Sequence, residues 1–154
     1  MQKKEIAAAL TALKEIKVHK IEDKALRNDL IANHFALLDA GKKHDAAVED
    51  KRTVFLAAYK DEETEIGELQ QKLQISQDPA EARELSAQIL SHKDYRLAAR
   101  AFNDEVDALG KEEVPGLKKI DREKFMAEIE KQDFKLAWVE ALYPLFVMEE
   151  KKEK

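Results

Sequence analysis

The side chains of this 154-residue chain that could bind a metal ion are its histidines and carboxylates, because the sequence contains no cysteine. Helical di-iron sites need a glutamate three residues before each inward-facing histidine, but isoleucine or glycine occupies every such position here. Glu15 and His19 are four residues apart, a spacing that is more typical of a surface ion pair than of a metal site. We therefore expect no metal, and no other cofactor.

Motifs for nucleotide binding and nucleophilic catalysis are also missing. The sequence has no Gly-x-Gly-x-x-Gly, no P-loop and no Gly-x-Ser-x-Gly. Glu62 and His92 are the only candidate acid/base couple that the expected fold brings together, and a two-helix hairpin offers no concave pocket around them. We predict that the protein is not an enzyme.

Two rows of basic side chains could contact phosphates if each row lies on one helix face. The first row is Lys17, Lys20, Lys24 and Arg27, and the second is Lys93, Arg96 and Arg100. Acidic neighbours interrupt both rows, and the whole chain has a formal charge of −5. Solvated helix faces are the simpler interpretation, so nucleic acid is an unlikely partner and remains an alternative.

An apolar, aromatic segment near the end of the sequence favours either a core or an interface. Residues 142–148 are apolar on every side of a helix, and five of the ten aromatic residues lie at or after Phe125. In the first interpretation they cover an N-terminal apolar stripe that contains Ile6, Leu10, Leu13, Leu30 and Leu37. In the second, some remain for a protein partner or a second copy: Trp138, Leu142, Tyr143, Leu145, Phe146 and Met148.

Long helices must position these side chains, because glycine and proline are scarce and 38% of the residues are charged. Apolar spacing predicts a helix over residues 3–18, a short break at 19–23, and a helix that runs to 75 with a bend near Gly41. Asp78, Pro79 and Glu81 then form a helix start. The next helix is expected to run from 79 to 109 and to stop at Gly110.

Folding the sequence about Gln77 pairs these two helices as an antiparallel hairpin. Apolar residues then face apolar residues at most levels, for example Leu69 with Leu85 and Ile66 with Ile89. The exception is a polar layer midway, which we interpret as a register device. It consists of Tyr59, Glu62, His92 and Arg96, with Glu62 opposite His92 and Tyr59 opposite Arg96.

The expected organisation is one helical domain of 1–154. Helices at 1–43 and 121–148 form a small base, with a bend or stop at Pro144; residues 44–110 form a coiled-coil-like hairpin with its turn at 76–79; 111–120 is a loop; and 149–154 is a frayed tail. The predicted fold class is all-α. The predicted function is a non-enzymatic protein-interaction module in the cytoplasm, without a membrane span, that acts through helical contacts as an assembly, adaptor or chaperone-like protein. The alternative is a nucleic-acid-associated helical protein of a kind that a phage or mobile element could encode.

Overall fold

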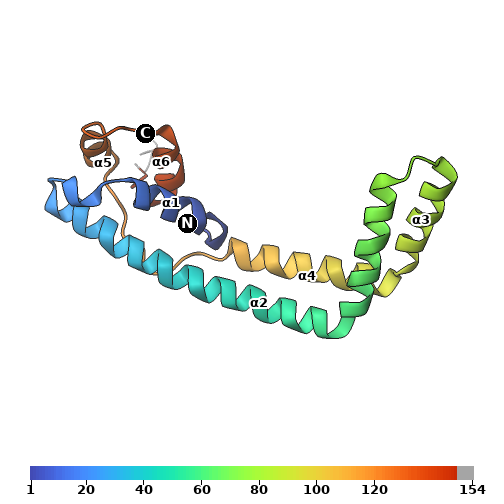
Figure 1. The fold of residues 1–154 in the computed structure, drawn as a ribbon. Coiled ribbons are helices and arrows are strands. Elements are labelled where there is room, and N and C mark those ends of the chain that lie inside the picture. Colours follow the sequence, from blue (N-terminus) through green and yellow to red (C-terminus); the bar gives the residue numbers. More distant parts are fainter. Residues whose placement is uncertain (149–154) are drawn as a thin grey trace, which may run out of the picture. The chain divides into compact units, whose positions relative to one another are not determined.

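A computed structural model describes residues 1–148, and the regular structure in this part is helical (Figure 1). The all-α fold with a helical hairpin is confirmed. The tail expected at 149–154 lies outside the described residues. The α-helices are α1 (Ile6–Glu15), α2 (Lys24–Ile75), α3 (Pro79–Ser91), α4 (Lys93–Lys111), α5 (Arg122–Ile129) and α6 (Leu136–Leu142), with 3₁₀ turns at Lys3–Glu5, Val18–Lys20 and Tyr143–Leu145.

The chain forms two compact units. One unit, here called the base, contains residues 1–45 and the chain from Gly110 onward; the other, here called the hairpin, contains residues 46–109. Helix α2 contributes its first part to the base and its second part to the hairpin.

The base has a continuous apolar core drawn from both ends of the sequence. Helix α1 contributes Ile6 and Leu13, and α2 contributes the fully buried Leu30 and Leu37. The C-terminal part of the core is Val114, Ile120, Phe125, Ile129, Trp138, Leu142, Leu145 and Phe146. The predicted N-terminal stripe is therefore covered by the C-terminal helices, as the first interpretation requires.

The segment between α1 and α2 does not form a continuous helix, so its side chains do not share one helix face. Ile16 and Ile21 are extended, and only a 3₁₀ turn separates them. The break is therefore longer than the sequence pattern predicts, because both isoleucines turn into the core at 3% and 1% exposure. Helix α2 then starts with the Asp23 carboxylate accepting a hydrogen bond from the Leu26 amide at 2.9 Å.

The hairpin has the predicted turn. Helix α2 ends at Ile75, and Asp78 begins α3 by accepting a hydrogen bond from the Ala80 amide at 3.0 Å, with Pro79 in the first turn. Ile66, Leu69 and Leu85 are the buried apolar residues within this unit. The two arms of the hairpin therefore bury only a narrow strip of apolar side chains between them.

Two expectations about the continuity of the long helices were wrong. The helix expected over 79–109 is interrupted at His92, whose backbone (φ −79°, ψ 64°) is not helical. Helix α2 is continuous through Gly41 and is instead kinked at Tyr59 (φ −131°, ψ 17°). A Cβ atom at Gly41 would lie 3.4 Å from Ile6 Cγ2, so this glycine allows α1 to pass close to α2 rather than bending it.

The C-terminal helix expected over 121–148 is also interrupted. Helix α5 ends at Ile129, and α6 begins only at Leu136. In the interval, the Gln132 amide group binds the backbone of Lys17 on both sides, accepting from its N–H at 2.9 Å and donating to its carbonyl at 3.1 Å. These tertiary bonds replace helical ones. Pro144 lies in the 3₁₀ turn after α6, where the sequence predicts an end or a kink.

Candidate interaction surface

The C-terminal apolar segment mostly belongs to the core. Of the six residues that the sequence offers as a partner surface, Trp138, Leu142, Leu145 and Phe146 are at most 4% exposed. A partner cannot contact them without unfolding the base. Tyr143 and Met148 remain exposed and line a hollow together with Met126. Met148 is the last residue that the structure describes.

A different surface leaves large apolar side chains in solvent. Along the first part of α2, Ile31 is 42% exposed and Phe35 is 67% exposed, and Leu38 follows one turn later on the same face. We call these three residues the α2 apolar row. Leu38 is half-buried, and Ile31 and Phe35 are exposed; neighbouring exposed apolar side chains of this kind are candidates for a binding surface.

The α2 apolar row forms one wall of a groove, and α1 forms the other. Two hollows of about 410 and 400 Å³ lie along it and share Leu38. The first is lined by Leu13, Lys14, Ile16, Val18, His19, Leu30, Ile31, His34, Phe35 and Leu38. The second is lined by Lys3, Lys4, Ile6, Ala7, Leu10, Leu38, Gly41, Lys42, His44 and Asp45. We call the two together the α1/α2 groove.

Polar contacts, one buried and one nearer the surface, hold the walls of this groove in place. The fully buried Asn33 on α2 accepts a hydrogen bond from the Lys118 amide at 2.6 Å and donates one to its carbonyl at 2.9 Å. On α1, Glu15 accepts hydrogen bonds from Trp138 Nε1 at 2.8 Å and from Lys135. These bonds, with Trp138 first, lower the pKa of Glu15.

The start of α2 is held by Glu128 of α5. Its carboxylate accepts hydrogen bonds from the amides of Glu22 at 3.1 Å and Asp23 at 3.3 Å, immediately before the helix. The Glu22 amide bond is the main reason that the pKa of Glu128 is lowered, and Lys131 at 3.7 Å acts in the same direction. Lys131 also bonds Glu22, which raises the pKa of Lys131.

The predicted polar layer is present in the hairpin, with one change. His92 Nδ1 lies 3.4 Å from Glu62 and its Nε2 lies 3.8 Å from Glu65, so two carboxylates of α2 flank one imidazole. The side chain that contacts Tyr59 is Tyr95 rather than Arg96, with ring centroids 6.1 Å apart. Arg96 is exposed.

An aromatic cluster beside this layer was not anticipated from the sequence. Phe55 lies at its centre, with ring centroids 5.3 Å from Phe102, 5.5 Å from Tyr59 and 5.6 Å from Tyr95. Burial, and then the charges of Glu63 and Glu62, raise the pKa of Tyr95. The cluster spans the kink in α2 and the break at His92, so both arms of the hairpin bend where their largest side chains meet.

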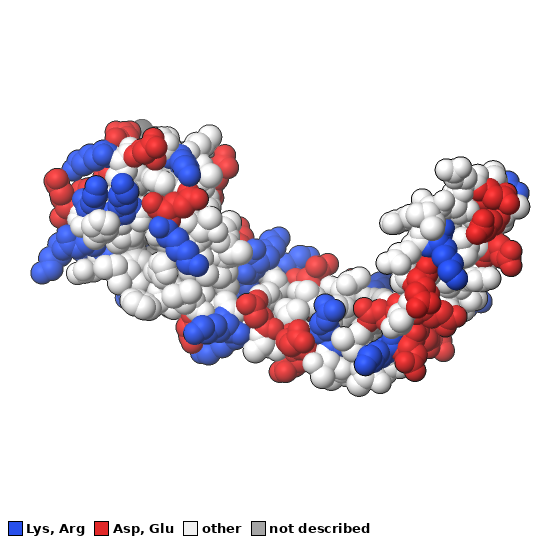
Figure 2. Space-filling view, viewed as in Figure 1, with Lys and Arg blue, Asp and Glu red and all other residues white. Residues whose placement is uncertain are grey.

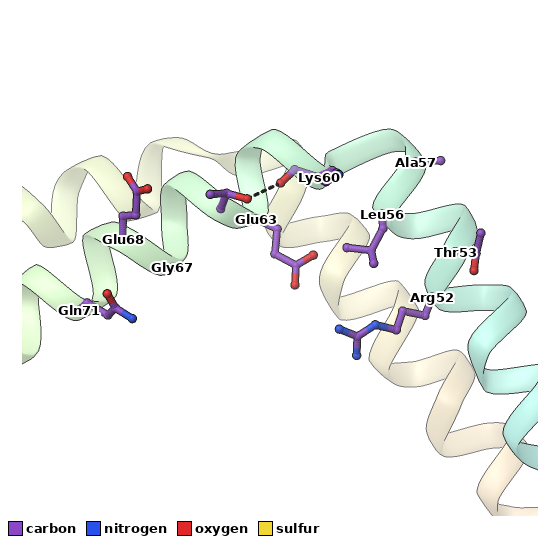
Figure 3. A pocket seen from close by; sticks show the side chains of 10 residues that line it. Arg52, Thr53, Leu56, Ala57, Lys60, Glu63, Gly67, Glu68 and Gln71 are labelled. Atoms are coloured by element: carbon purple, nitrogen blue, oxygen red, sulfur yellow. Dashed lines mark hydrogen bonds between the residues drawn. The ribbon is translucent and has the colours of Figure 1, made fainter.

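A shallow hollow of about 790 Å³ lies along one face of α2, lined by residues before and after the kink (Figure 3). Arg52, Leu56 and Glu63 point toward the same space from the two sides of Tyr59 (Figure 3). One Glu63 oxygen is buried and has no hydrogen-bond partner among the described residues. The hollow is open and charged, and we assign it no ligand.

The two basic rows differ in the structure. The first row would share a face only if one helix ran through residues 16–23, and it does not: Lys17 and Lys20 precede α2, and Arg27 donates a hydrogen bond to the Ile21 carbonyl at 3.0 Å. The second row does lie on one helix, α4, with all three side chains exposed: Lys93, Arg96 and Arg100.

Within residues 1–148, no three histidine or acidic side chains gather closely enough to hold a metal ion. No helix of that part is long and apolar enough to cross a membrane. No protein-family model matches the chain, and neither the curated proteins nor the solved structures provide a match.

Proposed function

We propose that this chain is a non-enzymatic protein-interaction module that acts through helical contacts, as an assembly, adaptor or chaperone-like protein. The observation that carries the proposal is the α2 apolar row in the wall of the α1/α2 groove, with Phe35 two-thirds exposed beside a well-packed core. Exposed aromatic anchors next to a groove are typical of protein interfaces.

The base gives this surface a rigid support. Asn33 ties α2 to the loop after α4, and Glu128 fixes the start of α2. A partner that packs on Phe35 would therefore meet a preformed groove and would lose little conformational entropy to order it. Val54 is 72% exposed on the hairpin part of α2, and the two buried polar residues of the described chain, Asn33 and Glu128, both lie in the base.

This difference supplies a matched control for the experiment. Wild type, Phe35→Asp and Val54→Asp are used as baits in cells that carry the natural gene, and captured proteins are compared by quantitative mass spectrometry. We expect specific partners to be depleted at least about tenfold by Phe35→Asp and retained by Val54→Asp. Identical capture profiles for the three baits would contradict the proposal, provided that their urea unfolding midpoints agree.

The alternative function, nucleic-acid association, draws support from the exposed basic row on α4. It predicts that labelled DNA or RNA binds at low ionic strength and is released as salt increases. Charge removal at Arg96 and Arg100 would then reduce the salt slope. Absence of salt-sensitive binding at about 50 mM salt would exclude this alternative.

A further inference from the structure

We infer that the α1/α2 groove binds an acidic amphipathic helix of a partner protein. This inference rests on the proposed function and adds the shape and the charge of the partner. Two independent observations carry it: the length of the groove with its apolar α2 wall, and the sign of the charges that line it.

The shape suits a helix. The groove runs between two helices, and its α2 wall carries the apolar side chains Ile31, Phe35 and Leu38 at helical spacing. From Ile31 to Asp45 the α2 wall is about 21 Å long at 1.5 Å per residue, which matches about four turns of a bound helix. An amphipathic helix binds such a groove with residues spaced i, i+3, i+4 and i+7.

The charges select the partner. Among the residues that line the groove, Lys4, Lys14 and Lys42 form no ion pair with any described residue, whereas Lys3 is neutralised by Glu112 at 2.6 Å. Asp45 is the only acidic side chain in the lining. A groove that carries excess positive charge within a chain of formal charge −5 is electrostatically complementary to carboxylates that flank an apolar stripe.

Other anionic ligands fit less well. A fatty acid needs a pocket that encloses most of its surface, but this groove is lined only by the N-terminal segment and α2. An anionic membrane would meet a concave surface on a protein of net negative charge. The hairpin has acidic side chains (Figure 2), so a second copy is a competing occupant that the experiment must separate.

The experiment uses three fluorescein-labelled peptides of about 15 residues and the full-length protein. The first has leucines at i, i+3, i+4 and i+7 with glutamates beside them; the second has lysines in place of the glutamates; the third is a scrambled form of the first. Fluorescence anisotropy is measured at about 50 and 300 mM salt. We expect the acidic amphipathic peptide to bind at least about tenfold more tightly than the other two and to weaken as salt rises.

Charge reversal tests the site. In Lys14→Glu/Lys42→Glu we expect the acidic peptide to lose at least about tenfold in affinity and the basic peptide to gain affinity. The control, Lys72→Glu/Lys93→Glu, changes the net charge equally at exposed hairpin positions and should leave both affinities within about twofold. Phe35→Ala should weaken the acidic peptide by about tenfold or more.

Each contrary result has a distinct meaning. If the basic peptide binds as tightly as the acidic one but Phe35→Ala still weakens both, the groove is a docking site and the charge inference is overturned. If no peptide binds at about 100 μM and capture is also insensitive to Phe35→Asp, the inference and the proposed function both fail. Two further results would assign a different occupant and overturn the inference. One is a dimer in sedimentation equilibrium that Phe35→Ala dissociates. The other is Phe35-dependent binding of anionic vesicles or oligonucleotides in the absence of peptide binding.

Discussion

The base and the hairpin use the same kind of helix but bury their apolar residues differently. In the base, side chains from segments more than 100 residues apart in sequence meet in one core, and buried polar groups such as Asn33 and Glu128 have their partners. In the hairpin only Ile66, Leu69 and Leu85 are buried, while Leu97 and Val54 are mostly exposed. The base therefore has a broad core that excludes solvent, whereas the hairpin depends on a narrow apolar seam and on half-buried aromatic side chains that meet between its two arms.

The largest expected effect is on the core of the base. Leu30→Ala, at a fully buried position, should lower the free energy of unfolding by about 3–5 kcal/mol, because it leaves a cavity among fixed neighbours. Leu85→Ala in the hairpin should cost about 2 kcal/mol, because a two-helix seam can relax around the gap. Urea denaturation followed by circular dichroism measures both losses. Equal losses would show that the base and the hairpin tolerate a cavity equally well.

Removing a buried hydrogen-bond partner from the base should have the next largest effect. Asn33→Ala leaves the Lys118 amide and carbonyl without their side-chain partner and should cost about 2–3 kcal/mol. Asn28, exposed on the same helix, is the control, and Asn28→Ala should change stability by less than about 0.5 kcal/mol. Equal urea midpoints for the two variants would show that the Asn33 contacts contribute nothing.

Acid should destabilise the base through Glu128. The pKa of this carboxyl is lower in the folded protein than in the unfolded chain, so its contribution is complete above its unfolded pKa and is lost as pH falls through its folded pKa. Glu128→Gln removes that contribution at every pH. The gap in unfolding free energy between wild type and Glu128→Gln should therefore be widest near neutral pH and close on acidification; a gap that is independent of pH would contradict this prediction.

The smallest expected effect on stability is at the groove. Phe35→Ala should change the free energy of unfolding by no more than about 0.5 kcal/mol, because the side chain is already mostly in solvent. The same variant should nonetheless lose partner binding. A loss of stability comparable to that of Leu30→Ala would show that Phe35 belongs to the core and not to the groove.

Local sequence chemistry was sufficient for the turn of the hairpin and for one of the two predicted pairs in its polar layer. Asp78 and Pro79 specify a helix start whatever lies around them, and folding about that turn correctly pairs Glu62 with His92. The breaks at Tyr59 and His92 could not be predicted, because neither glycine nor proline marks them. Near both breaks the rings of Phe55 and Tyr95 meet between the two arms of the hairpin, and a local sequence pattern does not show such a tertiary contact.

The candidate groove was missed for a similar reason. The sequence shows that Leu30 and Leu37 form one stripe of α2, and it places Phe35 outside that stripe. It does not show whether another element covers Phe35. From the sequence, the C-terminal segment was the stronger candidate for an exposed apolar surface, because its apolar residues are consecutive. Most of them are instead buried in the core. Which apolar residues are left over is a property of the whole packing.

The two-ended construction of the base has a consequence for synthesis on the ribosome. Hairpin contacts such as Glu62 with His92 join residues 30 apart, whereas the Lys17–Gln132 bonds join residues 115 apart. The hairpin can therefore pair while translation continues, but the apolar face of α1 has no C-terminal cover until the last core residue, Phe146, has emerged. During that interval the nascent chain exposes Ile6, Leu13 and Leu30 together, so premature termination after the hairpin would yield a product with an uncovered core and a strong tendency to aggregate.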